Sequence, residues 1–270
     1  MSFSAGGDKS HDEYSLAAEF YDGVVPYRER QDVVFFVEMA RAAVGPVLEL
    51  GCGTGRVLIP TAKAGCRIAG LDASSSMLAV CRQKLSAEPE EVQGRVTLTR
   101  GDMRRFDLRR EFDLITLPFR PFQHLLSVGD QLSCLTSIHR HLAPGGRLVL
   151  DIFNPSIPHL AALEGTPLPP DNEPEFTLPD GRRVLRRVRV TGRDLFSQIQ
   201  EIELKYLVTH PDAREELFSH RIRMRYLFRH EAEHLLARCG FEVEDVFADY
   251  DRTPYGAKYP GELIFVATRA

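Results

Sequence analysis

Residues 47–55 read Val-Leu-Glu-Leu-Gly-Cys-Gly-Thr-Gly, a short apolar run that passes directly into a turn with glycine at alternate positions. The apolar run has the length of a buried strand, and Glu49 lies near its carboxyl end. Glycine has no Cβ, so such a turn can adopt positive φ angles and approach a ligand closely. Residues 56–64 then have a helical pattern that ends at Gly65. A strand, a glycine turn and a helix in this order predict a nucleoside-cofactor site at the carboxyl edge of a parallel sheet.

The spacing of the glycines distinguishes between nucleoside cofactors. A dinucleotide motif counted from Gly51 requires a third glycine at position 56, where this chain has Arg56. The pattern Glu-x-Gly-x-Gly-x-Gly, beginning at Glu49, instead resembles motif I of the class I S-adenosylmethionine (SAM)-dependent methyltransferases. SAM has no pyrophosphate, so close contact with backbone matters more than a helix end that cradles phosphate. A nicotinamide dehydrogenase is therefore disfavoured.

Two further apolar runs end in carboxylates. Residues 66–72 end in Asp72, and residues 95–102 end in Asp102 beside Met103. An acid at the position of Asp72 can accept hydrogen bonds from both ribose hydroxyls, although it could also cap the following helix. The resemblance implies that Asp102 contacts the adenine amino group while Met103 packs on the ring. The full set of expected cofactor residues is Tyr14, Tyr21, Glu49, Gly51, Cys52, Gly53, Gly55, Arg56, Asp72, Ala73, Met77, Asp102, Met103 and Pro118.

The resemblance covers most of the first half of the chain and returns at its carboxyl end. Residues 112–117 and 147–153 are predicted strands, with a helix over 130–142 and a turn at 144–146 between them. Residues 226–243 resemble the last helix and sixth strand of these enzymes, and residues 263–268 their antiparallel seventh strand. The implied fold is α/β: a Rossmann-like, seven-stranded, mostly parallel sheet with helices on both faces. The chain is similar to the small-molecule branch that contains glycine N-methyltransferases and deoxyaminosugar N-methyltransferases.

An insertion separates the fifth and sixth predicted strands. Residues 154–181 contain seven prolines and are expected to form a long loop. The pattern then changes to period two, which predicts three antiparallel strands over a substrate crevice. We therefore expect a helical N-terminal segment, residues 1–45, over the cofactor site, in which a helix over 14–27 covers the cofactor and a helix over 29–43 packs on the sheet. The SAM-binding core is residues 46–154 and 227–270, and the antiparallel substrate cap is residues 155–226.

The composition limits the classes of partner that this protein is expected to bind. The 270 residues carry 34 basic and 38 acidic side chains, a net charge of −4 that offers no general attraction for nucleic acid. No apolar run has the length of a membrane span, and residues 1–7 do not resemble a signal peptide. The five cysteines are odd in number and show no metal-ligand spacing. We expect a cytoplasmic monomer or homodimer that binds no metal, nucleic acid or membrane. An Asn/Asp-Pro-Pro-Tyr-like element of nucleobase methyltransferases is also missing at residues 117–120.

Methyl transfer asks for in-line alignment and exclusion of water more than for reactive side chains. An amine acceptor has to be neutral at attack, whereas a hydroxyl usually needs a base. His124 follows the fourth predicted strand and is the candidate base, although a histidine in a tight loop can also simply bond to backbone. The residues expected to contact the substrate are Phe119, Arg120, Gln123, His220 and Tyr226.

The predicted reaction moves a methyl group from SAM to an amine or hydroxyl of a small molecule, leaving S-adenosylhomocysteine. The same cofactor also serves cyclisation and aminopropyl transfer, and a protein can bind SAM only to regulate another enzyme. The three intact acidic strand ends, Glu49, Asp72 and Asp102, favour a working enzyme over a regulatory protein.

Overall fold

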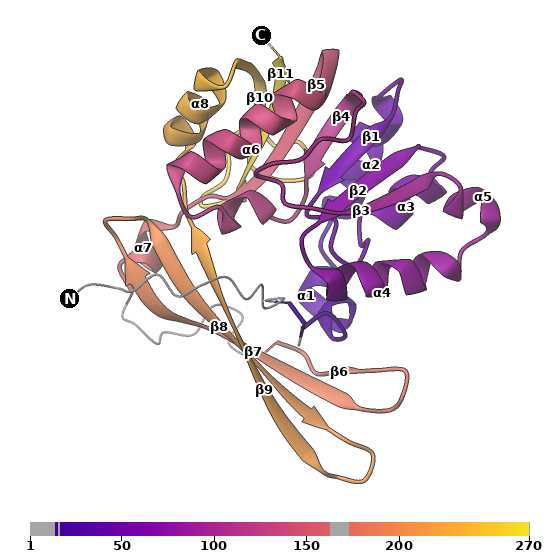
Figure 1. The fold of residues 1–270 in the computed structure, drawn as a ribbon. Coiled ribbons are helices and arrows are strands. Elements are labelled where there is room, and N and C mark those ends of the chain that lie inside the picture. The colour runs from indigo at the N-terminus through magenta and orange to yellow at the C-terminus, as the bar shows by residue number, and fades with distance from the viewer. Residues whose placement is uncertain (1–13, 16, 163–172, 270) are drawn as a thin grey trace.

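The computed structural model describes residues 14–15, 17–162 and 173–269. Its main layer is a seven-stranded sheet with the strand order β10-β11-β5-β4-β1-β2-β3 (Figure 1). Strands β1 to β5 are parallel to one another, and β11 is antiparallel to both β10 and β5. The strands are β1 Val47–Leu50, β2 Ile68–Asp72, β3 Val96–Arg100, β4 Phe112–Leu117, β5 Leu142–Phe153, β10 Phe241–Phe247 and β11 Glu262–Arg269. The expected sheet is confirmed.

Helices cover both faces of this sheet, which is why its central strands are apolar at successive positions. Val47 packs in one core cluster with Phe36 and Leu58, whereas Leu48 packs in another with Leu135. The first cluster includes residues of α2, α3 and α4, and the second includes residues of α6 and α8. The helices of this layer are α2 Asp32–Ala42, α3 Leu58–Lys63, α4 Ser75–Ser86, α5 Glu90–Gln93, α6 Val128–His141 and α8 Arg229–Arg238.

A second, antiparallel sheet has the order β6-β7-β8-β9 and projects away from the main layer (Figure 1). The separate antiparallel sheet is confirmed, with a short fourth strand beside the three expected. Its inward face packs against the N-terminal segment; for example, the rings of Tyr206 and Phe20 lie 5.4 Å apart. The strands are β6 Phe176–Thr177, β7 Arg183–Asp194, β8 Ile199–Thr209 and β9 Glu215–Arg225.

Several local expectations were wrong. Residues 14–27 do not form one helix: within the described residues they form turns, the 3-10 helix η1 Tyr21–Gly23 and the short helix α1 Val25–Arg28. Pro26 has no backbone N–H, so it is tolerated in the first turn of a new helix, which begins at Val25, and cannot extend an earlier one. Residues 144–146 are not a separate turn, because β5 runs through them and a register shift against β4 absorbs the glycines.

The predicted loop over residues 154–181 also contains structure. It includes α7 Ile157–Leu160 and strand β6, while residues 163–172 lie outside the described residues. Residues 1–7, on which the signal-peptide expectation rested, lie outside them too. The helix expected over 29–43 is confirmed as α2.

Candidate active site

A cavity of about 470 Å³ lies at the carboxyl ends of β1, β2 and β3, between these strand ends and the N-terminal segment. All of the predicted cofactor residues except Gly55 line it. Of the predicted catalytic and substrate residues, His124 and Phe119 line it. The tertiary structure therefore brings together residues that lie more than 100 positions apart in the chain. Further residues that line the cavity, which the sequence interpretation did not include, are Thr54, Val57, Leu71, Ser74, Arg100, Gly101, Arg104, Pro121, Leu125 and Asp130.

The three motif glycines all have positive φ, but for different physical reasons. A Cβ on Gly51 would lie 2.6 Å from Pro121, and one on Gly55 would lie 2.6 Å from the sulfur of Cys81. Gly51 and Gly55 are therefore required by packing. Around Gly53 (φ +52°) the nearest atom to such a Cβ is 4.0 Å away. Since Gly53 also lines the cavity, its missing side chain leaves space for a ligand.

Glu49 is a buried acid at the end of β1, with an exposed fraction of 2%. Within the described residues, its Oε2 atom has no hydrogen-bond partner. Burial raises its pKa to about 8, an effect that Arg56 opposes and that Asp32 and Asp72 reinforce. A buried carboxylate that lines a cavity with an unsatisfied oxygen is suited to a cationic ligand group. The α-ammonium of a methionine moiety is such a group, so Glu49 and Gly53 fit SAM.

Asp72 organises the glycine turn. Its two carboxylate oxygens accept hydrogen bonds from the backbone N–H of Gly53 (2.7 Å) and of Ser74 (2.8 Å). The alternative that Asp72 caps the next helix is wrong, because the hydroxyl of Ser74 accepts the N–H of Met77 at the start of α4. Asp72 thus connects the ends of β1 and β2 and also lines the cavity.

Asp102 lies at a more open end of the cavity, with 44% of its side chain exposed. Its carboxylate forms an ion pair with Arg104 at 2.5 Å, and this hydrogen-bonded guanidinium lowers the pKa of Asp102. Arg104 also pairs with Asp130 at 3.3 Å. The predicted contact of Asp102 with an adenine amino group therefore requires Arg104 to share the carboxylate.

Three ring side chains from distant segments lie together at the cavity, and two of them, Tyr14 and His124, line it. The hydroxyl of Tyr14 lies 3.0 Å from Nε2 of His124, which belongs to the 3-10 helix η2 Pro121–His124. The ring of His220, from β9, lies 5.0 Å from the Tyr14 ring in an edge-on arrangement. Burial, with a smaller effect of His220, lowers the pKa of His124 to about 4, and burial also lowers the pKa of His220. Both imidazoles are consequently neutral at pH 7.

The other predicted substrate residues lie outside the cavity lining. The Gln123 amide is occupied, since it donates to the carbonyl of Arg225 and accepts the N–H of Phe153. Arg120 pairs with Glu262 at 2.8 Å. Tyr226 is buried, with its ring 5.9 Å from that of Phe228. Their role in substrate binding stays a prediction.

The N-terminal segment is tied to the cofactor loop by a residue that the sequence interpretation did not single out. Asp22 accepts hydrogen bonds from the hydroxyl of Thr54 (2.7 Å) and from Lys84 (2.6 Å). Thr54 belongs to the quoted glycine motif, but a single Asp in a distant segment gives no signal of this pairing. Tyr14 and Tyr21 are held over the cavity by the same segment.

Within residues 14–15, 17–162 and 173–269, no group of three or more His, Cys, Asp or Glu side chains is arranged to hold a metal ion. No helix in these same ranges has the length and apolar character needed to cross a membrane.

Comparison with known proteins agrees with this site. A family profile described as "Methyltransferase domain" matches residues 47–146, which include the glycine motif and the acids at all three strand ends. The dTDP-3-amino-3,6-dideoxy-alpha-D-glucopyranose N,N-dimethyltransferase of Streptomyces fradiae is 29% identical over 84% of each chain.

Solved structures share the whole fold. The CcbJ methyltransferase of Streptomyces caelestis has a TM-score of 0.74 at 24% identity, and the match covers 96% of this chain and 98% of that one. SAM-bound CalS10, an amino pentose methyltransferase from Micromonospora echinaspora, has a TM-score of 0.68 at 27% identity, covering 93% and 96%. With the SAM-compatible cavity, the domain match and these relatives show that the chain is a SAM-dependent methyltransferase, similar to the class I enzymes.

Proposed function

We propose that this enzyme methylates the amino group of a small molecule of the deoxyaminosugar class. The observation that carries the proposal is the neutral Tyr14–His124 pair in the cavity wall, where a neutral amine can be oriented without an ionised side chain. The similarity to the S. fradiae amino-sugar N,N-dimethyltransferase and to CalS10 supports the same acceptor class.

The cofactor, when bound, supplies a methyl group already activated by a sulfonium. We assign the cation-binding role to Glu49, the ribose hydroxyls to Asp72, and the adenine to Asp102 and Met103. Phe119 and Tyr21 line the cavity, and we assign to them the exclusion of water during methyl transfer. Remaining contacts come from the rest of the predicted set, Gly51, Cys52, Gly53, Arg56, Ala73, Met77 and Pro118, all of which line the cavity.

The pKa of His124 refines the base expected from the sequence. A group with a pKa of about 4 is a weak base at pH 7, so it does not hold a proton taken from the substrate. It is nevertheless a good hydrogen-bond acceptor. We assign to Tyr14 and His124 the task of orienting the lone pair of an amine that binds in its neutral form. His220, which packs against Tyr14, holds that ring in place.

Tyr14→Phe and His124→Ala should each lower kcat by about 10- to 100-fold while changing the SAM dissociation constant less than about 3-fold, because both residues act on the acceptor. Release of S-adenosylhomocysteine from a panel of free and nucleotide-linked aminosugars measures kcat, and calorimetry measures binding. His139→Ala is the matched control, since His139 belongs to α6 and packs against Phe241.

The pH dependence gives a second test of the same assignment. His124 stays neutral throughout pH 6–8. The pH profiles of kcat for the wild type and for His124→Ala should therefore have the same shape near pH 6.5. Unchanged kcat in both variants would contradict the assignment, and release of methylthioadenosine in place of S-adenosylhomocysteine would contradict methyl transfer.

The division of the chain and its setting belong to the same proposal. Residues 155–226 form the substrate cap, residues 1–45 cover the cofactor, and residues 46–154 with 227–270 bind SAM. The enzyme works in the cytoplasm as a monomer or homodimer, with a small-molecule substrate and no nucleic-acid or membrane partner. All five cysteines are free thiols, which supports a reducing compartment.

A further inference from the structure

Two consecutive residues after β4 adopt the left-handed conformation that side chains other than glycine rarely occupy. Phe119 has φ +62° and Arg120 has φ +73°. Neither is glycine, so each position costs free energy and persists only where surrounding contacts hold it. This pair, Phe119–Arg120, is called the left-handed turn below.

The left-handed turn determines where the Phe119 ring lies. That ring lines the cavity and meets the Tyr27 ring edge-on at 4.6 Å. The guanidinium groups of Arg30 and Arg56 lie 5.1 Å and 4.9 Å from its centroid. A change of backbone conformation at residues 119–120 would move the ring away from these contacts and alter the wall of the transfer site.

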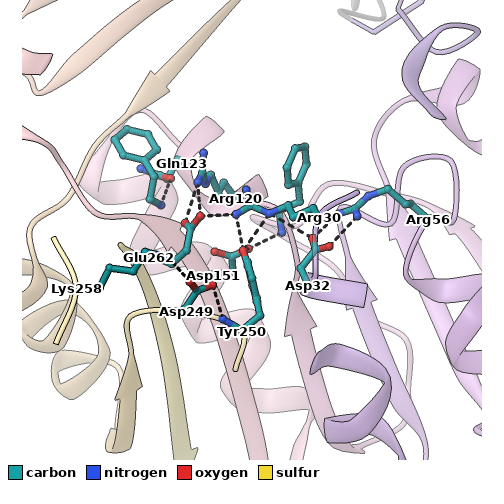
Figure 2. Close-up of polar contacts among 12 residues, drawn as sticks. Arg30, Asp32, Arg56, Arg120, Gln123, Asp151, Asp249, Tyr250, Lys258 and Glu262 are labelled. Atoms are coloured by element: carbon teal, nitrogen blue, oxygen red, sulfur yellow. Dashed lines mark hydrogen bonds and ion pairs between the residues drawn. The ribbon is translucent and has the colours of Figure 1, made fainter. Parts of the chain in front are cut away.

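A closed circuit of hydrogen bonds begins and ends at the left-handed turn (Figure 2). The N–H of Phe119 donates to Oδ2 of Asp151 at 2.9 Å, and the hydroxyl of Tyr250 donates to the same oxygen at 2.8 Å. Arg30 donates to the Tyr250 oxygen at 2.5 Å and to Glu262 at 2.7 Å. Arg120 donates to both oxygens of Glu262 at 2.8 Å, which returns the circuit to the turn.

The circuit draws on four separate segments. Asp151 is on β5, Glu262 on β11, Tyr250 in the connection between β10 and β11, and Arg30 just before α2. Asp151 is fully buried and Tyr250 nearly so, and the two arginines are paired with carboxylates. Buried charges need such pairing. Pairing alone, however, does not explain why both ends of the circuit contact the same strained turn at residues 119–120.

We propose that Asp151, Tyr250, Arg30 and Glu262 are positioning residues that hold the left-handed turn and thereby fix the Phe119 ring in the wall of the cavity. None of the four is among the residues that line the cavity, so they act on it through the turn and, for Arg30, through the Phe119 ring. The link to transfer rests on the proposed function, whereas the link to the turn does not.

Fluorine NMR of the full chain labelled with 4-fluorophenylalanine tests the link to the turn without any substrate. One of the 16 phenylalanine signals is assigned to Phe119 by its loss in Phe119→Leu. We expect Glu262→Gln and the milder Tyr250→Phe to shift or broaden that signal. Glu244→Gln, which breaks an ion pair with Arg147 between β10 and β5, should leave it unchanged. An unaltered Phe119 signal in both circuit variants would overturn the proposal.

A rescue variant separates relief of strain from general damage. Glycine adopts φ +73° without steric cost, so Arg120→Gly in the Glu262→Gln background should restore the Phe119 signal toward the wild-type position. A double variant as perturbed as Glu262→Gln alone would overturn the proposal. Melting temperature, followed by circular dichroism, identifies any variant that fails to fold, and Tyr250→Phe then carries the test.

Turnover measured separately connects the turn to catalysis. We expect Glu262→Gln to lower kcat about 10-fold or more while the SAM dissociation constant changes less than 3-fold, and the double variant to recover most of the loss. Absence of methylation of any amine by the wild type would contradict the proposed function alone, since the fluorine signals still decide whether the circuit holds the turn. Recovery of the signal without recovery of kcat would overturn the link to transfer.

Discussion

Replacing Gly53 with valine should abolish measurable SAM binding, a loss of at least about 100-fold, while leaving the sheet folded. The backbone at Gly53 has φ +52°, and the volume that a Cβ would enter is open on the cavity side. A branched side chain there occupies ligand space and also strains the turn by about 1–2 kcal/mol. The backbone N–H of Gly53 donates to Asp72, so distortion of the turn also displaces the Asp72 carboxylate. Calorimetric titration with SAM measures the loss.

Gly145→Val is the matched control for strain without a ligand site. Gly145 also has a positive φ, +75°, with no atom within 4 Å of an added Cβ, but it lies in β5 and not in the cavity lining. Both variants should lose similar thermal stability, and only Gly53→Val should lose SAM binding. Equal SAM affinity in the two variants would place the cofactor elsewhere.

Glu49→Gln should weaken SAM binding and stabilise the free protein at high pH. Loss of a buried charge-assisted hydrogen bond costs about 1.5–3 kcal/mol, which corresponds to roughly 10- to 100-fold in affinity. Without a cation beside it, however, the ionised form of Glu49 destabilises the folded state, because burial raises its pKa to about 8. Glutamine is isosteric and carries no charge, so the variant lacks this destabilisation.

The sign of the pH effect follows from the direction of the shift. The folded pKa of about 8 lies above the ordinary value of 4.5, so the protonated carboxyl is favoured by the folded state. Its stabilising contribution is complete below pH 4.5 and is lost as the pH rises through 8. Wild type and Glu49→Gln should therefore melt at similar temperatures at pH 5, and the variant should melt higher at pH 9.

Proton release provides a second readout for Glu49. At pH 7 the free protein holds Glu49 mainly protonated, and pairing with an ammonium favours the carboxylate. Titrations in two buffers of different ionisation enthalpy should show release of close to one proton on SAM binding by the wild type and almost none by Glu49→Gln. Equal proton release from both proteins would remove Glu49 from the cation site.

Local sequence patterns predicted those parts of the site that a single strand–turn–helix unit builds. Glu49, Gly53 and Asp72 were identified because each follows an apolar run, and the carboxyl ends of parallel strands meet at one edge. The antiparallel sheet was identified from its alternating residues, whose inward positions do pack on the N-terminal segment. The single helix expected over residues 14–27 was wrong, because Pro26 lies in the first turn of a separate helix that begins at Val25.

Side chains that pair across the fold left no local pattern. Arg120 and Gln123 were expected to contact a substrate since they follow β4, and this stays a prediction; their pairing with Glu262 and with the backbone of β5 could not be predicted from the sequence. Asp22 and Tyr250 gave no signal at all, because their partners lie 32 and 99 positions away.

The sequence by itself determined the order of strands and helices, the glycine turn and the three acids, since apolar period and backbone freedom are properties of neighbouring residues. Only the tertiary structure decided which motif glycine has open space beside it, which buried carboxylate oxygens have no hydrogen-bond partner within the described residues, and how the left-handed turn is held. Those features depend on burial and on hydrogen bonds between distant segments, and both arise only when the chain is packed.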